Sequence, residues 1–501
     1  MVQLPVDVPS LRTLPCAALT ILLLSGCAVG PDFKNPAPPD VSGYTARPVD
    51  TTVATANIAG GEAQRFIKGS DIAADWWTLF HSTHLNELIE QSLANNSDLK
   101  AARAALSVAR ENVLAQRGAY YPALTGGFSA ARSKQSAALS PTPADNASQY
   151  DLFTPELAIS YAPDVFGLNQ RTVESLKAQE EAARYQMVAT FDTLIANVVV
   201  TAIQEASVQA QIDATRQLIE IDTNMLQILQ YQFGKGYAGG LDLAAQKSQL
   251  AQTVATLPPL VKQKAQLHDL MAVLTGQFPS QAPQESFDLA SLQLPQALPM
   301  SLPSELVAQR PDVLQAQENL HAASAQIGIA VANRLPNIQL TADAGSMALT
   351  FGQLFTPGSG FWDLGAAVAA PIFDGGTLLH RERGARAAYD QAAQQYRGTV
   401  LIAFQNVADT LVALEQDAEG LKAAADADDA AKTTLDLTQR QLKDGYASYL
   451  SLLNAEQAYQ QAHIALIQAE ASRYADTAAL FQALGGGWWH RADLNEAKND
   501  N

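Results

Sequence analysis

The chain has 501 residues, of which 48% are apolar and 16% charged, and its formal net charge is −18. This apolar content excludes a wholly disordered chain, and the acidic balance argues against nucleic-acid partners. The sequence holds no GxSxG, P-loop or GxGxxG pattern and its seven histidines are scattered, so it predicts no enzyme, no cofactor and no metal site.

Residues 1–26 have the pattern of a secretory signal. An apolar run of about eight residues, Ala17–Leu24, is too short to span a bilayer, which needs roughly 20 residues. The following stretch, LSGC, resembles a bacterial lipobox, which implies cleavage before Cys27 and covalent lipid on that residue. At least two acyl chains would then anchor the protein. The alternative is an ordinary signal with an incidental cysteine. Because Ala28 and not aspartate follows Cys27, analogy with lipoprotein sorting favours the outer membrane.

After residues 27–83, interpreted as the anchor and an extended segment, the chain repeats itself. Asp98, Leu106 and Pro122 recur as Asp312, Leu320 and Pro336 at a single offset of 214 residues. A period of this length predicts a duplicated domain and not a short-repeat solenoid. We assign the first repeat to 84–290, the second to 291–487, and a polar tail to 488–501.

Each repeat predicts a medium helix, two strands joined by a polar loop, a very long helix, a glycine turn and a second medium helix. The long helices are expected at 170–233 and 378–443, and the medium ones at 85–118, 241–276, 306–334 and 450–484. Apolar residues at the 4,3 spacing of a coiled coil mark the long helices. These residues are Leu218, Ile221, Met225 and Ile228 in the first repeat and Val400, Phe404, Val407, Leu411, Leu414 and Ala418 in the second.

Between these helices lie four alternating segments, 123–130, 157–161, 338–343 and 362–370. Their length and alternation suit transmembrane β-strands, which need roughly 9–11 residues. Four strands cannot close a barrel, and open sheet edges are not tolerated in lipid. The sequence therefore predicts an oligomer that shares one barrel, with long helices continuing the cylinder out of the bilayer.

Four motifs make this chain similar to the TolC-like outer-membrane factors, in the lipoprotein branch that serves tripartite efflux pumps. The motifs are CAVGPDF (27–33), WWTLF (76–80), RPDV (310–313) and ALGGGW (483–488). The resemblance implies a mostly α-helical protein with a small β part. It also implies a homotrimer with a 12-stranded barrel in the outer membrane and an α-helical barrel in the periplasm. The implied partners are a periplasmic adaptor and an inner-membrane transporter, and the implied function is efflux of drugs or other toxic small molecules.

The resemblance also places functional residues at the periplasmic tips. Adaptor contact falls on the tip turns, whose residues are Gly236, Tyr237, Gly445 and Tyr446. Asp242 matches an acidic latch between neighbouring coils, and Leu450 matches an apolar constriction. Where the family often carries a ring of aspartates, this chain has Ser451 and Asn454. We therefore expect a gate closed by packing at Leu450 and by hydrogen bonds from Asp242 and Asn454; the alternative for Asn454 is a helix cap or packing residue.

The sequence leaves two other functions open. A lipid-anchored structural coiled-coil protein would explain the anchor and the helices, but not four alternating segments at equivalent points of two repeats. An exit duct of a type I secretion system would explain all of these features, and the lipobox only weakly favours efflux over it.

Overall fold

A computed structural model describes residues 28–134, 149–281 and 287–495 of the chain. These residues form two compact units, and each unit draws on both sequence repeats. The first unit combines residues up to 35 with 107–182 and 317–395. The second unit combines residues 36–106, 183–316 and 396 onward. The predicted signal and Cys27 lie outside the described residues.

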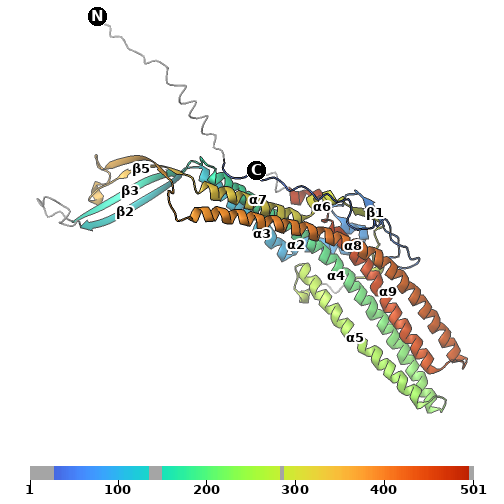
Figure 1. Ribbon diagram of the computed structural model, residues 1–501. Coiled ribbons are helices and arrows are strands. Elements are labelled where there is room, and N and C mark those ends of the chain that lie inside the picture. Colours follow the sequence, from blue (N-terminus) through green and yellow to red (C-terminus); the bar gives the residue numbers. More distant parts are fainter. Residues whose placement is uncertain (1–27, 135–148, 282–286, 496–501) are drawn as a thin grey trace, which may run out of the picture. The chain divides into compact units, whose positions relative to one another are not determined.

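The order of elements is the same in both repeats, as predicted, and Figure 1 labels most of them. The first repeat contains α2 (Thr83–Asn95), α3 (Ser97–Arg117), β2 (Ala123–Lys134), β3 (Gln149–Tyr161), α4 (Leu168–Gly234) and α5 (Gly240–Leu274). The second contains α6 (Pro303–Gln309), α7 (Pro311–Ala332), β5 (Asn337–Ser346), β6 (Gly360–Ala369), α8 (Thr377–Lys443) and α9 (Tyr449–Ala483).

The first medium helix of each repeat is interrupted, so the predicted single helices at 85–118 and 306–334 are wrong. The chain leaves the helical conformation at Asn96 and at Arg310, which have ψ values of 132° and 123°. Asn96 accepts hydrogen bonds from the backbone of Asp98 and Leu99 and so begins α3. Arg310 precedes Pro311, whose ring disfavours the helical conformation in the residue before it. The two interruptions lie at equivalent positions of the repeat.

The predicted coiled-coil seam is confirmed on α8 and wrong in part on α4. On α8, Val400, Val407, Leu411, Leu414 and Ala418 are buried. On α4, Leu218 is buried and Met225 packs, partly buried, against the cluster that contains Leu435 and Leu452. Ile221 and Ile228 are exposed in the single chain. Asp222 and Leu229 are buried instead, and the Asp222 carboxylate accepts hydrogen bonds from side chains of α5.

All four predicted strands are present in the first unit and form one antiparallel sheet in the order β2-β3-β5-β6. A second, parallel sheet, which no sequence pattern predicted, pairs β1 (Arg65–Lys68) with β4 (Ala297–Met300) in the second unit. Its strands have four residues each, too short to show a periodicity.

Around this small sheet lies the aromatic core of the second unit. The WWTLF motif forms a short 3₁₀ helix whose Trp76 and Phe80 are fully buried. Trp76 stacks on Phe481 of α9, with ring centroids 5.0 Å apart. The motif that contributed to the family resemblance is therefore a packing motif.

Among the described helices, α4 alone is long and apolar enough to cross a membrane by length and composition. Because 67% of its most apolar stretch is buried inside the protein, α4 has the character of a core helix.

Candidate channel-forming site

The four-stranded sheet has one apolar face and one polar face. Residues directly opposite each other in neighbouring strands share a face, so the register assigns whole rows of side chains. One row runs through Leu124, Ile159, Ala342 and Leu364 across all four strands. Other large apolar residues that share this face are Phe128, Leu157, Leu340, Trp362 and Val368.

This apolar face is uncovered in the single chain. Trp362 and Leu364 are 75% and 73% exposed, and Leu124 and Phe128 are also exposed. Soluble monomers rarely show such a contiguous apolar surface, whereas a transmembrane strand turns its apolar face to lipid.

The opposite face carries polar and charged groups. Its next row contains Thr125, Ala158, Asp343 and Asp363, and Glu156 lies on the same face. Asp343 and Asp363 are direct cross-strand partners. Two like charges in that position are destabilising unless water surrounds them. The arrangement fits a barrel whose interior is filled with water.

The sheet has two free edges among the described residues. Strand β2 pairs only with β3, and β6 pairs only with β5. An unpaired edge exposes backbone N–H and C=O groups, which hydrocarbon cannot satisfy. A lipid-embedded sheet of this kind needs strands from other chains.

The predicted tip turns are present at one end of the second unit. There α4, α5, α8 and α9 run side by side (Figure 1), and side-chain hydrogen bonds join α5 to both α4 and α9. Gly236 and Gly445 have φ values of 78° and 80°, a conformation that glycine adopts without steric cost. Tyr237 and Tyr446 are 83% and 87% exposed beside them. Both turns thus present an aromatic side chain to solvent.

The predicted gate residues lie just inside these turns. Asp242 accepts a hydrogen bond from the backbone N–H of Gly239 at 3.3 Å and so caps α5. Leu450, Ser451 and Asn454 are exposed on the first turns of α9. The Ser451 hydroxyl lies 2.8 Å from that of Ser448. Within the single chain, the Asp242 carboxylate therefore caps its own helix. A latch between neighbouring coils would have to use this same carboxylate.

Sequence reasoning missed a buried polar cluster farther along the same helices. Asp222 of α4 accepts hydrogen bonds from Thr253 at 2.8 Å and from Gln246 at 3.3 Å, both on α5. Glu456 of α9 is 3% exposed, and neither of its carboxylate oxygens has a partner among the described residues. Burial, together with the negative charge of Asp222, raises the pKa of Glu456 to about 7.

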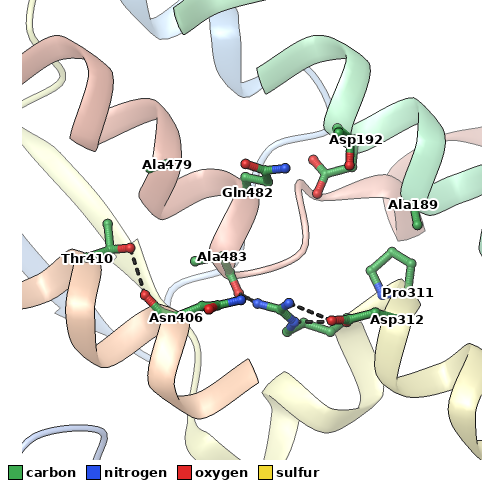
Figure 2. Close-up of a pocket in the computed structure, with 11 residues that line it drawn as sticks. Ala189, Asp192, Pro311, Asp312, Asn406, Thr410, Ala479, Gln482 and Ala483 are labelled. Atoms are coloured by element: carbon green, nitrogen blue, oxygen red, sulfur yellow. Dashed lines mark hydrogen bonds and ion pairs between the residues drawn. The ribbon is translucent and has the colours of Figure 1, made fainter. Parts of the chain in front are cut away.

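A cavity of about 340 Å³ opens among α4, α7, α8 and α9 in the second unit (Figure 2). Arg310 makes an ion pair with Asp312 at 2.6 Å on its wall and donates to the backbone oxygen of Ala483 at 2.8 Å. Asp192 lies on the opposite wall, with 6% of its surface exposed. Burial raises the pKa of Asp192 to about 8. No member of the predicted site lies here.

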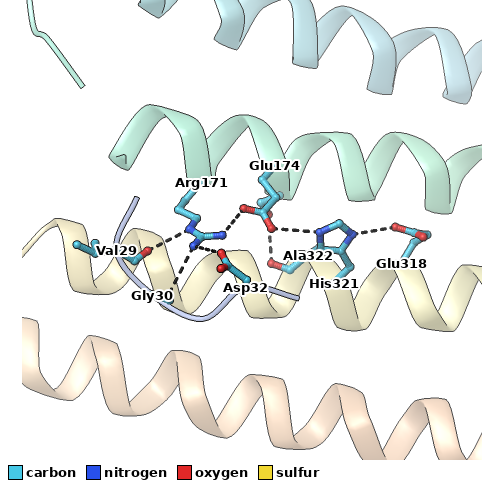
Figure 3. Close-up of polar contacts among 9 residues, drawn as sticks. Val29, Gly30, Asp32, Arg171, Glu174, Glu318, His321 and Ala322 are labelled. Atoms are coloured by element: carbon cyan, nitrogen blue, oxygen red, sulfur yellow. Dashed lines mark hydrogen bonds and ion pairs between the residues drawn. The ribbon is translucent and has the colours of Figure 1, made fainter. Parts of the chain in front are cut away.

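The segment that follows Cys27 is held by a polar cradle in the first unit (Figure 3). Arg171 of α4 donates to the backbone oxygen of Val29 at 3.0 Å and pairs with Asp32 and Glu174, each at 2.7 Å. His321 of α7 stacks on Phe33 with a centroid distance of 4.4 Å. The cradle fixes the chain directly after the predicted lipid attachment site.

Close backbone approach tightens this contact. A Cβ on Gly30 would lie 2.4 Å from the Cα of Gly328, and Gly30 has a φ of 97°. Glycine is therefore required where the segment crosses α7. The carboxylates of Glu318 and Glu174 lie 3.2 Å from the two ring nitrogens of His321 and raise its pKa above the ordinary value.

Known proteins match this chain across both of its repeats. The family profile described as outer membrane efflux protein matches residues 88–276 and 302–486. The toluene efflux pump outer membrane protein TtgF of Pseudomonas putida is 31% identical over 472 residues, which cover 93% of this chain and 95% of that protein. The outer membrane protein OprJ of Pseudomonas aeruginosa is 29% identical over 488 residues, or 94% of this chain and 95% of that protein. Among solved structures, the outer-membrane channel OprN superposes with a TM-score of 0.80 at 28% identity, covering 92% of this chain and 100% of that one.

Proposed function

Because the chain belongs to the outer membrane efflux protein family, we propose that copies of it assemble into the exit channel of a tripartite efflux system. The protein is an outer-membrane efflux component that extends into the periplasm, as are its relatives. Its partners are the other parts of such a pump: a periplasmic adaptor and an inner-membrane transporter. In this proposal its role is conduction and not catalysis.

The four-stranded sheet with two free edges is the observation that carries this proposal. Three copies would supply 12 strands and pair every edge, with the apolar faces toward lipid and the aspartates toward water. The cradle around Val29 to Phe33 supports lipid attachment at Cys27, because an anchor beside the sheet would hold each copy at the membrane.

The tip turns are the proposed adaptor contacts, and their exposed tyrosines are the residues expected to bind. Tyrosine supplies a large contact area at low entropic cost and is enriched at binding surfaces. Replacing both Tyr237 and Tyr446 with serine should therefore abolish resistance to toxic compounds in cells while leaving conductance of the purified channel unchanged.

Native mass spectrometry and planar-bilayer recording of the full-length protein test the channel itself. We expect a trimer that conducts ions. A single-chain species that remains stably inserted in a bilayer and passes no current would refute the proposal. A deletion strain should also become sensitive to one or more compounds in a panel of solvents and antibiotics, and regain resistance from a plasmid copy.

A structural coiled-coil role is not supported, because it leaves the exposed apolar face of the sheet unexplained. Secretion of a polypeptide through the same duct would give the same trimer and current. The two functions would differ in the panel of solvents and antibiotics: if the duct secretes a polypeptide, the deletion strain would keep its resistance.

A further inference from the structure

The cavity bounded by Asp192, Arg310 and Asp312 carries an unbalanced negative group. The Arg310 guanidinium satisfies both oxygens of Asp312. The Oδ1 atom of Asp192, in contrast, is buried beside Gly486 and has no hydrogen-bond partner among the described residues. Figure 2 shows that the carboxylate group as a whole is directed toward the cavity that Asp192 lines. A buried carboxylate without a partner is costly, so the site needs either a proton or a cation.

The backbone around Asp192 is shaped to keep this group in place. Gly486 lies so close that a Cβ on it would come within 2.0 Å of Oδ1, and its φ of 68° suits glycine. No larger residue could occupy this position with the carboxylate where it is. The close contact leaves no room for a larger side chain between position 486 and Asp192.

The cavity walls indicate the kind of cation. Arg310 and Asp312 cancel, so an ionised Asp192 leaves one net negative charge. The remaining polar lining is neutral and includes the side-chain amides of Asn406 and Gln482. Three further lining residues are apolar, namely Ala189, Pro311 and Ala479. No set of three or more metal-ligating side chains occurs among the described residues, and about 340 Å³ is far more than one ion fills.

We propose that this cavity binds a small organic ammonium ion, with Asp192 as its counter-ion and the apolar wall in contact with a short aliphatic chain. The proposal concerns the wall of the helical unit and does not depend on what the channel conducts.

Binding of such an ion has a distinctive consequence for protons. Because burial holds Asp192 largely protonated at neutral pH, an ammonium ion must displace that proton as it binds. At pH 7, about one proton should be released for each ligand bound.

Isothermal titration calorimetry of the full-length protein with n-butylammonium tests this directly. Titrations at pH 7 in two buffers of different ionisation enthalpy give the number of protons released. We expect saturable binding with proton release, and no saturable binding of n-butanol, the uncharged analogue. Absence of butylammonium binding, or equal binding of butanol, would overturn the proposal.

Variants locate the site. Asp192→Asn should weaken butylammonium binding at least tenfold and abolish proton release. Ala479→Leu should weaken binding by occupying part of the cavity while leaving the carboxylate in place. Asp417→Asn, which removes another carboxyl of raised pKa outside the cavity, is the matched control and should bind normally. Unchanged affinity in both cavity variants would place the bound ion elsewhere and refute the assignment.

Discussion

At the scale of single residues, Gly486 is a constrained position in the second unit. An alanine there would place its Cβ 2.0 Å from the Asp192 Oδ1 atom and would hold a φ of 68°, which L-residues avoid. We expect Gly486→Ala to destabilise the protein by about 2 kcal/mol or more.

Thermal unfolding monitored by circular dichroism in detergent measures this effect. The matched control is Gly420→Ala on α8, where an added Cβ meets nothing within 4 Å. That control should stabilise the helix by about 0.5–1 kcal/mol, since alanine is the better helix former. Equal effects of the two substitutions would contradict the steric account.

The proposed constriction at Leu450 makes a second prediction at this scale. Its side chain is 64% exposed in the single chain, so truncation removes little internal packing. If neighbouring copies close the pore with it, Leu450→Ala should raise single-channel conductance in planar bilayers without changing thermal stability.

The matched control is Leu241→Ala, at the equivalent position of the first repeat and also exposed. Its conductance should stay near that of the parent protein. Unchanged conductance in Leu450→Ala would remove this leucine from the gate.

At the scale of elements, α9 carries a pH-sensitive contact. Glu456 is buried against the negative charge of Asp222, and both effects raise its pKa to about 7. A carboxyl with a raised folded-state pKa stabilises the fold below its unfolded pKa and loses that contribution as pH rises through the folded value. Glu456 therefore stabilises the fold below pH 4.5, and this stabilisation is lost by about pH 7.

Replacement by an amide removes this dependence. Glu456→Gln should raise the unfolding temperature at pH 8, where the parent carboxyl is ionised, and change it little at pH 5. Glu415→Gln, an exposed position on α8, should show no such difference between the two pH values. A Glu456→Gln effect of equal size at both pH values would indicate packing and not ionisation.

Most elements could be predicted from the sequence because long periodic segments and strong strand alternation leave few alternatives. The interruptions at Asn96 and Arg310 could not, since apolar periodicity continues across them, although Pro311 was a usable signal. The seam on α4 failed for a related reason. Apolar spacing favoured Ile221, but the buried position is Asp222, whose partners lie on another helix. Likewise, the cavity at Asp192 depends on contacts among four helices that no local pattern encodes.

At the scale of the whole molecule, the surface of the proposed channel would be complete only between copies. The sheet presents its apolar residues on one face and its aspartates on the other, and both of its edges are open. The proposed gate residues Leu450 and Asn454 are likewise exposed in the single chain. Sequence could therefore place the proposed gate on the chain but could not give its geometry, because in the proposed channel that geometry depends on contacts between chains.

The buried carboxyls also lead to a prediction of how the stability of the whole protein depends on pH. Burial is the largest cause that raises the pKa of Asp192 to about 8 and those of Asp417, Glu456 and Glu470 to about 7. Each of these carboxyls stabilises the fold at pH values below the ordinary carboxyl pKa. This stabilisation is lost as pH rises through the raised pKa values. His321, whose pKa is also raised, changes stability in the same direction. Among the carboxyls with lowered pKa, Asp71 and Asp374 are exposed, so solvent screens their charges and they weigh little. Glu382, which pairs with Arg334 and Arg386, acts in the opposite direction but is a single group against several.

Stability should therefore fall steadily between pH 5 and pH 8, with a decrease in unfolding temperature of roughly 5 °C or more. Unfolding scans of the full-length protein at one heating rate and constant ionic strength measure this slope. Replacing Asp192 and Glu456 together by their amides should flatten the curve by raising its alkaline end. A curve that instead rises from pH 5 to pH 8 would mean that ionised carboxylates in favourable pairs dominate, and that the buried groups find partners in the assembled channel.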